Sequence, residues 1–168
     1  MRPVCRAGIG LVVLLLTGLL SPLAARAAEW GLIQPGVSTT QSVRQRYGAP
    51  SRTERKKVDN YDTESWIYEG DRAPSGLMRL TVDFGILQDN KYRPDVVRVF
   101  QLEPHGATFN RGIIGNGWGF PDGNGKQGDE EFFVYKEGLL VYFNPDGWTV
   151  RLMVFTVPQP RDPTEQQR

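Results

Sequence analysis

Cysteine and histidine are almost absent from this 168-residue sequence, which contains only Cys5 and His105. Cys5 lies in a segment that we expect to be removed, so the mature chain has no disulfide, no thiol nucleophile and no cysteine-ligated metal. A single histidine cannot form a histidine-rich zinc site, and no Gly-x-Ser-x-Gly elbow accompanies it. His105 stands between proline and glycine, a setting typical of a solvated loop. We expect no catalytic residue, no metal and no cofactor.

A surplus of charge of either sign is missing as well. The sequence has 20 Lys and Arg against 19 Asp and Glu, and without its first 27 residues it has 17 against 19. Nucleic-acid binding and polybasic membrane anchoring both need clustered Lys and Arg. The near-neutral balance, without a basic stripe, therefore argues against both classes and indicates an exported globular protein.

Residues 1–27 have the composition of a secretory leader. They contain three arginines and no acidic or aromatic residue, and residues 8–20 are apolar apart from one threonine. This run is shorter than the ~20 residues that a membrane span needs, and Ala25-Arg26-Ala27 offers small residues to signal peptidase. We predict a Sec-type signal peptide cleaved after Ala27 and a periplasmic or secreted protein. Lipidation is not expected, because Cys5 precedes the apolar run.

The clearest local pattern after the leader predicts a short helix between Gly36 and Pro50. Ser38 can cap the helix start, and Gln41 stands where a capping box has its Glu or Gln. Gly48 suits the left-handed position after the last turn, and Pro50 stops continuation. Because a helix of about ten residues is not stable alone, it must pack on something.

Alternating apolar and polar residues predict a sheet beside that helix. Met78 to Phe84 have the period of two that is typical of a strand with one buried face. Strands are expected at residues 64–68, 78–84, 96–102, 132–135, 139–143 and 148–157. Short turns at residues 136–138 and 144–147 favour antiparallel neighbours. The predicted class is α+β, with a short helix packed on an antiparallel meander.

The second half of the chain echoes the first, which raises the possibility of two tandem repeats. A Gly to Pro interval, an aromatic strand and two further strands occur in the same order in both halves, although the second half has too many glycines for a good helix. The expected units are a signal peptide (1–27), a first α+β unit (28–105), a second β-rich unit (106–157) and a flexible tail (158–168). The second unit is a possible degenerate repeat that could also pack with the first as one domain.

The first unit resembles the SmpA/OmlA (BamE-like) family through an ordered set of short motifs. These are Ile33-Gln34-Pro35-Gly36-Val37-Ser38, Val43, Tyr47-Gly48-Ala49-Pro50, Trp66-Ile67-Tyr68 and Val82-Asp83-Phe84. The resemblance implies helices on a three-stranded antiparallel sheet. It also implies an envelope protein that binds other proteins during outer-membrane assembly. Tandem copies of a similar fold resemble the β-lactamase-inhibitor proteins, which are secreted and also work by binding.

The sequence departs from the family in two ways. The founding members are lipoproteins, whereas this chain has no lipidation cysteine, and its linkers around Lys56-Lys57 and residues 85–94 are long. The resulting hypothesis is a non-catalytic exported module that binds an envelope or secreted protein, as an envelope-assembly accessory. The alternatives are a secreted enzyme inhibitor or a small secreted hydrolase.

The hydrolase alternative depends on the acidic segment from Asp122 to Glu131. Counted from Asp122, the positions that an EF-hand loop reserves for its fifth, sixth and twelfth residues hold Lys126, Gln127 and Phe133, so that match fails. A looser calcium site would use three side chains, Asp122, Asn124 and Asp129. Consecutive acids point in different directions, which argues against a glycosidase pair. A solvated acidic loop is the simpler interpretation.

The strongest candidate for a binding surface is the loop that contains Trp118, Phe120, Pro121 and Asp122. Glycines flank its two aromatic residues, and exposed aromatic anchors contribute much of the energy of protein interfaces. The structural alternative is that Trp118 and Phe120 fasten the loop onto the sheet. We predict that these four residues bind a partner protein.

Overall fold

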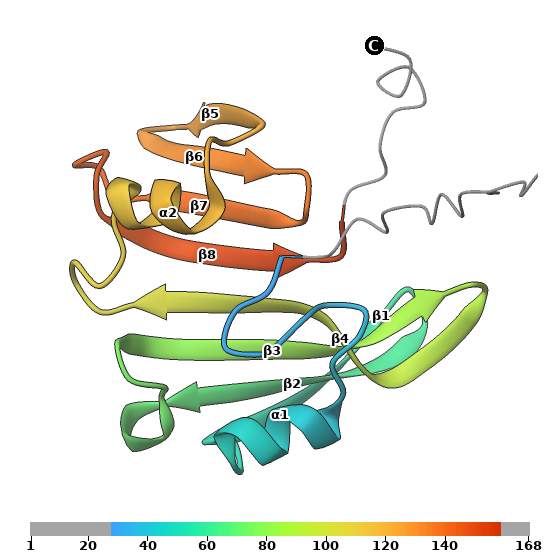
Figure 1. Cartoon of the computed structure of the whole chain (residues 1–168). Coiled ribbons are helices and arrows are strands. Elements are labelled where there is room, and N and C mark those ends of the chain that lie inside the picture. The colour runs from blue at the N-terminus through green and yellow to red at the C-terminus, as the bar shows by residue number, and fades with distance from the viewer. Residues whose placement is uncertain (1–27, 159–168) are drawn as a thin grey trace, which may run out of the picture.

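The computed structural model describes residues 28–158 and contains one eight-stranded antiparallel sheet with two short helices (Figure 1). The predicted signal peptide and residues 159–168 of the predicted tail lie outside the described residues. The elements in chain order are α1 (Thr40–Tyr47), β1 (Arg52–Val58), β2 (Tyr61–Glu69), the 3-10 turn η1 (Gly70–Arg72), β3 (Leu77–Gln88), β4 (Lys91–Pro104), α2 (Arg111–Trp118), β5 (Gly123–Gln127), β6 (Glu130–Tyr135), β7 (Leu139–Phe143) and β8 (Val150–Thr156). The strand order across the sheet is β1-β2-β3-β4-β8-β7-β6-β5.

The predicted α+β class is wrong, because strands dominate the structure. Helix α1 followed by β1–β4 forms one half of the sheet, and α2 followed by β5–β8 forms the other. The two halves join where β4 pairs with β8, from Val99 opposite Thr156 to Leu102 opposite Met153. The fold is therefore a sheet with two eight-residue helices on it, and not a helix packed on a three-stranded meander.

Helix α1 confirms the predicted helix but begins one residue later than expected. The N-cap is Thr39, whose side chain accepts from the Ser42 amide while the Ser42 hydroxyl accepts from the Thr39 amide. This is a capping box with other partners than Ser38 and Gln41. Gly48 has φ +75° and its amide bonds the Arg44 carbonyl, which ends the helix as predicted. Val43 is the buried residue of the helix.

Helix α2 overturns the expectation that the second half lacks a good helix. Its N-cap, Asn110, accepts a hydrogen bond from the Ile113 amide, and Gly119 ends it with φ +78°. Ile114 is fully buried against the core. A cap and one deeply packed side chain therefore outweigh the poor helix propensity of the glycines.

Two strands have no alternating apolar pattern and were not predicted. Strand β1 consists largely of exposed charged residues, and β5 contains two glycines and no apolar residue. Each is an edge strand, held by backbone pairing to β2 and β6 respectively. The expected long linkers are thus strands joined by tight turns, at Asp59-Asn60 and Asp89-Asn90, with φ between +50° and +68°.

All six predicted strands are confirmed, with one correction to the buried face. Leu77 and not Met78 is buried, because the β3–β4 register shifts between Leu77 and Arg79. From Leu80 to Phe84 the expected alternation holds, with Leu80, Val82 and Phe84 fully buried.

One face of the sheet carries a continuous aromatic core. Where the two halves meet, the rings of Phe100 and Phe155 stack with their centroids 4.4 Å apart. Each half also has a T-shaped pair at 4.9 Å between its second and third strands, Trp66 with Phe84 and Phe133 with Phe143. Similar contacts therefore organise both halves of the core.

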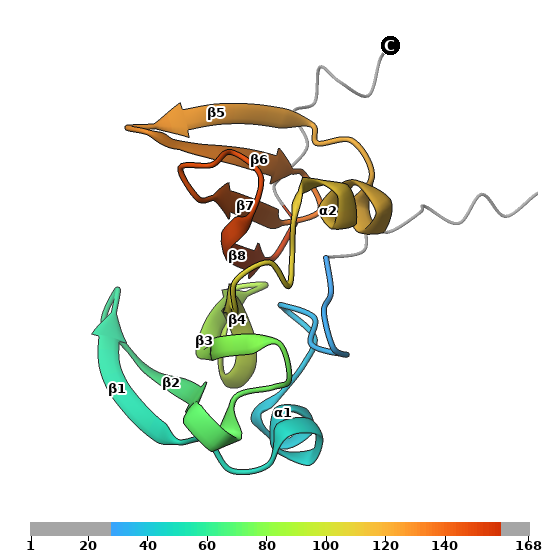
Figure 2. The same cartoon turned by 90° about the vertical axis from the view of Figure 1, so that its left-hand side faces the viewer.

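Among the described residues 28–158, no helix lies over the opposite face of the sheet. Figure 2 shows α1, α2 and the segment that precedes α1 on one side of the sheet, while the β1–β2 and β5–β6 hairpins curve toward the other side. The helix-free side, which we call the open face, is therefore concave.

Candidate protein-binding surfaces

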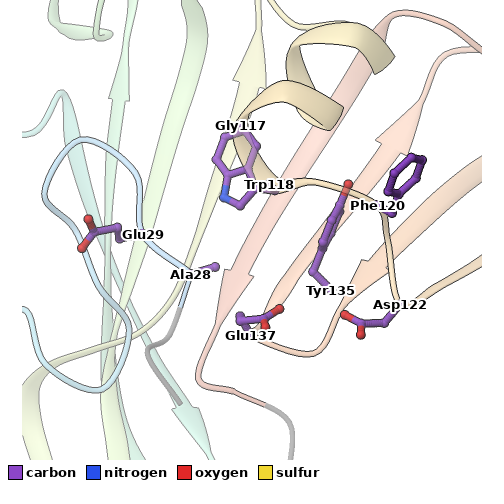
Figure 3. Close-up of a pocket in the computed structure, with 8 residues that line it drawn as sticks. All are labelled: Ala28, Glu29, Gly117, Trp118, Phe120, Asp122, Tyr135 and Glu137. Carbon is purple, nitrogen blue, oxygen red and sulfur yellow. The ribbon is translucent and has the colours of Figure 1, made fainter. Parts of the chain in front are cut away.

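The predicted binding loop borders a pocket of about 520 Å³ on the helix side of the sheet (Figure 3). The lining residues come from the start of the described chain, the end of α2, the loop before β5 and the turn after β6. They are Ala28, Glu29, Gly117, Trp118, Phe120, Asp122, Tyr135 and Glu137. In Figure 3, the side chains of Trp118, Tyr135 and Glu137 face a common space next to Ala28, and the Glu29 carboxylate points away from it. We call this cavity the aromatic pocket.

The four predicted binding residues have different surroundings. Trp118 is half-buried and packs T-shaped on Phe155 with ring centroids 6.2 Å apart, so it fastens the loop to the core. Phe120 is 99% exposed. Pro121 is partly buried and lines a neighbouring hollow, and Asp122 accepts a hydrogen bond from the Lys136 amide at 2.8 Å. Three of the four, Pro121 being the exception, line the aromatic pocket.

Hydrogen bonds fix the frame of the aromatic pocket. The Ala28 amide donates to the Glu137 carbonyl at 2.8 Å, and the Tyr135 hydroxyl donates to the Gly119 carbonyl at 3.2 Å. Burial raises the pKa of Tyr135, and the neighbouring Asp122 charge raises it further. The tyrosine therefore stays neutral at physiological pH and keeps donating this bond, which holds the end of α2 against β6.

The open face carries the second candidate surface. On β6, β7 and β8, six apolar side chains point to this face, pair across the strands and are partly exposed: Phe132, Val134, Leu140, Tyr142, Leu152 and Val154. We call them the apolar patch. The rings of Phe132 and Tyr142 contact each other with centroids 5.7 Å apart.

One ion pair borders the apolar patch, and others lie on the other half of the open face. Arg151 Nη2 donates to Glu130 at 2.6 Å at the end of the patch. On the other half of the open face, Arg79 bonds Glu69 at 3.1 Å and Glu103 at 3.0 Å across three strands. Hydrogen bonds from Arg79 and then Arg52 lower the pKa of Glu69. The open face thus has an apolar centre in one half and fixed charge in the other.

The acidic segment that prompted the hydrolase and calcium hypotheses is mostly a hairpin, β5 and β6. Glu130 and Glu131 are consecutive strand residues and point to opposite faces. Glu130 pairs with Arg151, while Glu131 accepts from Arg111 and pairs with Lys126 at 3.2 Å. These two carboxylates therefore do not converge on a common point. Among residues 28–158, no group of three or more His, Cys, Asp and Glu could hold a metal ion.

His105 lies in the exposed loop that follows β4, as the sequence indicated. The apolar patch, by contrast, was missed by sequence reasoning. Its signal was present, since residues 132–135, 139–143 and 152–155 are apolar at nearly every position, which is typical of strands with both faces covered. Within the described part of the chain, helices cover only one of those faces.

Comparisons with protein-family models, curated proteins and solved structures gave no match for this chain. The geometry alone therefore defines its class, which is an eight-stranded antiparallel sheet protein with one helix-covered face and one concave, partly apolar open face. In residues 28–158 no helix is long and apolar enough to cross a membrane.

Proposed function

We propose that this chain is a non-catalytic, exported protein-binding module that acts in the cell envelope. The observation that supports it most is the apolar patch on the open face. Partly exposed apolar side chains gathered on one surface next to polar groups are typical of protein-binding sites, and the Arg151–Glu130 pair borders this patch. Export rests on the leader pattern of residues 1–27, and the envelope role rests on the resemblance of residues 30–102 to the SmpA/OmlA family.

The occupant that fits the open face is a different folded protein with a convex surface. Two copies of this chain would bring two concave faces together and leave space between the patches. A convex partner can contact the patch and the charged half simultaneously. The ion pairs on that half contribute specificity more than affinity, because exposed pairs are worth little energy.

Site-specific photo-crosslinking tests this function. A photoreactive phenylalanine analogue replaces Tyr142 in the apolar patch, and the control replaces Gln45, which is exposed on α1 at the helix side. We expect the Tyr142 position to yield one adduct in envelope extract, competed by unlabelled mature chain, and the Gln45 position to yield none. Adducts of the chain with itself, or equal yields from both positions, would contradict the proposal.

The same experiment separates an envelope-assembly accessory from a secreted enzyme inhibitor. An accessory is expected to crosslink to an envelope protein that co-purifies with membranes. An inhibitor is expected to form a stoichiometric soluble complex with an enzyme whose activity falls as the complex forms. In either case, replacing Leu140 with lysine should weaken the purified complex, because it places a charge in the apolar patch.

A further inference from the structure

The aromatic pocket differs from the apolar patch in chemistry and position. Its walls are the rings of Trp118 and Tyr135, and the carboxylates of Asp122 and Glu137 lie at its edge (Figure 3). Of the described residues that line it, none is Lys, Arg or His. Phe120, beside the pocket, is 99% exposed.

We propose that the aromatic pocket binds an arginine side chain of the partner protein, an inference that rests on the proposed protein-binding function. A guanidinium can stack on aromatic rings and donate forked hydrogen bonds to carboxylates. The pocket offers both kinds of group on different walls. Phe120 then packs against the residues that flank the arginine.

The first half of the molecule has residues that are structurally equivalent to those around the aromatic pocket. In both halves a tyrosine of the second strand donates to the carbonyl of the glycine that ends the helix, at 3.2 Å: Tyr68 to Gly48 and Tyr135 to Gly119. The residues just before and after these glycines are therefore structurally equivalent. They are Tyr47 and Ala49 in the first half, and Trp118 and Phe120 in the second.

In the first half, other groups of the chain contact Tyr47 and Ala49. The Arg46 guanidinium lies 5.8 Å from the Tyr47 ring centroid, and Trp30 stacks on the same ring at 6.3 Å. Arg72, in the turn after β2, donates to the Ala49 carbonyl at 2.8 Å. In the second half the turn after β6 contributes Glu137 to the pocket and no arginine. In the first half, arginines thus contact the residues on both sides of the helix-ending glycine, whereas the equivalent residues of the second half lie beside carboxylates.

The pocket is preformed, which favours binding without a large ordering cost. Trp118 is held by its contact with Phe155, and Tyr135 by its bond to the Gly119 carbonyl. One Asp122 oxygen is fixed by the Lys136 amide. Arginine is favoured over lysine because its planar guanidinium can contact a ring and a carboxylate together.

Peptide titration followed by NMR tests this inference on the mature chain that begins at Ala28. The probes are Ac-Gly-Arg-Gly-NH2 and the same peptide with citrulline, which keeps the shape of arginine and lacks its charge. We expect the arginine peptide to shift the Trp118 indole N–H resonance saturably and the citrulline peptide to leave it unchanged. Equal shifts from both peptides, or no saturable shift with arginine, would overturn the proposal.

Two variants test whether the carboxylates of the pocket are responsible for binding the arginine peptide. Replacing both Asp122→Asn and Glu137→Gln should weaken arginine-peptide binding by about tenfold or more, since charge-assisted hydrogen bonds are lost. Glu54→Gln, an exposed β1 carboxylate that does not line the pocket, should leave binding unchanged. Equal weakening in both variants would mean that net charge, and not the pocket, attracts the peptide, and the proposal would fail.

The α-ammonium created by cleavage after Ala27 is a competing occupant, because Ala28 lines the pocket and is only 7% exposed. A version with Gly-Ser before Ala28 tests it. Equal binding by both versions supports a partner arginine, whereas binding only by the extended version overturns the proposal. Crosslinking from Tyr142 tests the proposed function separately. Its result can therefore be interpreted even if the pocket does not bind arginine.

Discussion

The two halves of the sheet have the same order of elements and the same core contacts, yet they present different surfaces. Each half has an eight-residue helix that ends at a left-handed glycine, and each has a tyrosine bonded to that glycine at 3.2 Å. The open face of the first half carries ion pairs, and that of the second half carries the apolar patch. Internal packing is therefore similar in the two halves, whereas the chemistry of their surfaces differs.

The same contrast holds on the helix side. Trp30 and Arg46 cover Tyr47 in the first half, whereas Trp118 faces the aromatic pocket in the second. Both candidate binding surfaces thus belong mainly to the C-terminal half. In the proposed function, the C-terminal half therefore supplies the main contacts to the partner, and the ion pairs of the N-terminal half add specificity.

The largest expected loss of stability comes from removing the aromatic contact that joins the two halves. Phe155→Ala removes a fully buried ring that stacks on Phe100 across the β4–β8 junction, so it should cost about 3–5 kcal/mol of unfolding free energy. Because the core is continuous, we expect urea unfolding followed by tryptophan fluorescence and by circular dichroism to coincide. Phe120→Ala is the control and should change stability by no more than about 0.5 kcal/mol. Separate transitions would show that the halves unfold independently.

A smaller change in stability is expected from glycine-to-alanine substitutions in and after α2. Gly115 lies in α2, and a Cβ added there would meet nothing within 4 Å. Gly115→Ala should therefore stabilise the protein by up to about 1 kcal/mol in thermal or urea unfolding, because alanine has the higher helix propensity. Gly119→Ala is the matched control: its φ of +78° is unfavourable for alanine, so it should destabilise. Stabilisation by both changes would contradict the assigned helix end.

The smallest effect concerns the acid response of one carboxylate in each half. Hydrogen bonds, first from Arg79 to Glu69 and from Lys126 to Glu131, hold both pKa values below the ordinary glutamate value. A lowered folded-state pKa contributes stability above the ordinary value and loses it as pH falls toward the folded pKa. We expect NMR titration midpoints of both side chains below the ordinary value. Lys126→Gln should raise the midpoint of Glu131 and leave that of Glu69 unchanged, whereas equal movement of both would indicate a general charge effect.

Local patterns predicted much of the fold. The helix end at Gly48, the alternation from Leu80 to Phe84 and the turn at residues 144–147 follow from short-range sterics and periodicity, which a single sequence displays. The predicted strands all exist. The class was nevertheless wrong, because the edge strands β1 and β5 are held by pairing with their neighbours and have no apolar pattern of their own.

The candidate site could be predicted only in part. Glycines around Trp118 and Phe120 suggested a loop with aromatic anchors, and Phe120 is indeed exposed. Tyr135 and Glu137 could not be assigned to the same place, because they come from a different strand and turn. The apolar patch was hidden for a related reason, since a run of apolar residues does not show which of its faces a helix will cover.

By itself the sequence determined the end of α1 at Gly48, the turn at residues 144–147 and the buried face from Leu80 to Phe84, because those features depend on neighbours one to four positions apart. Tertiary structure decided that eight strands join one sheet, that both helices lie on the same side, and that Trp118, Asp122 and Glu137 meet at one pocket. These outcomes depend on pairing and packing between residues distant in the chain, whose partners no local pattern specifies.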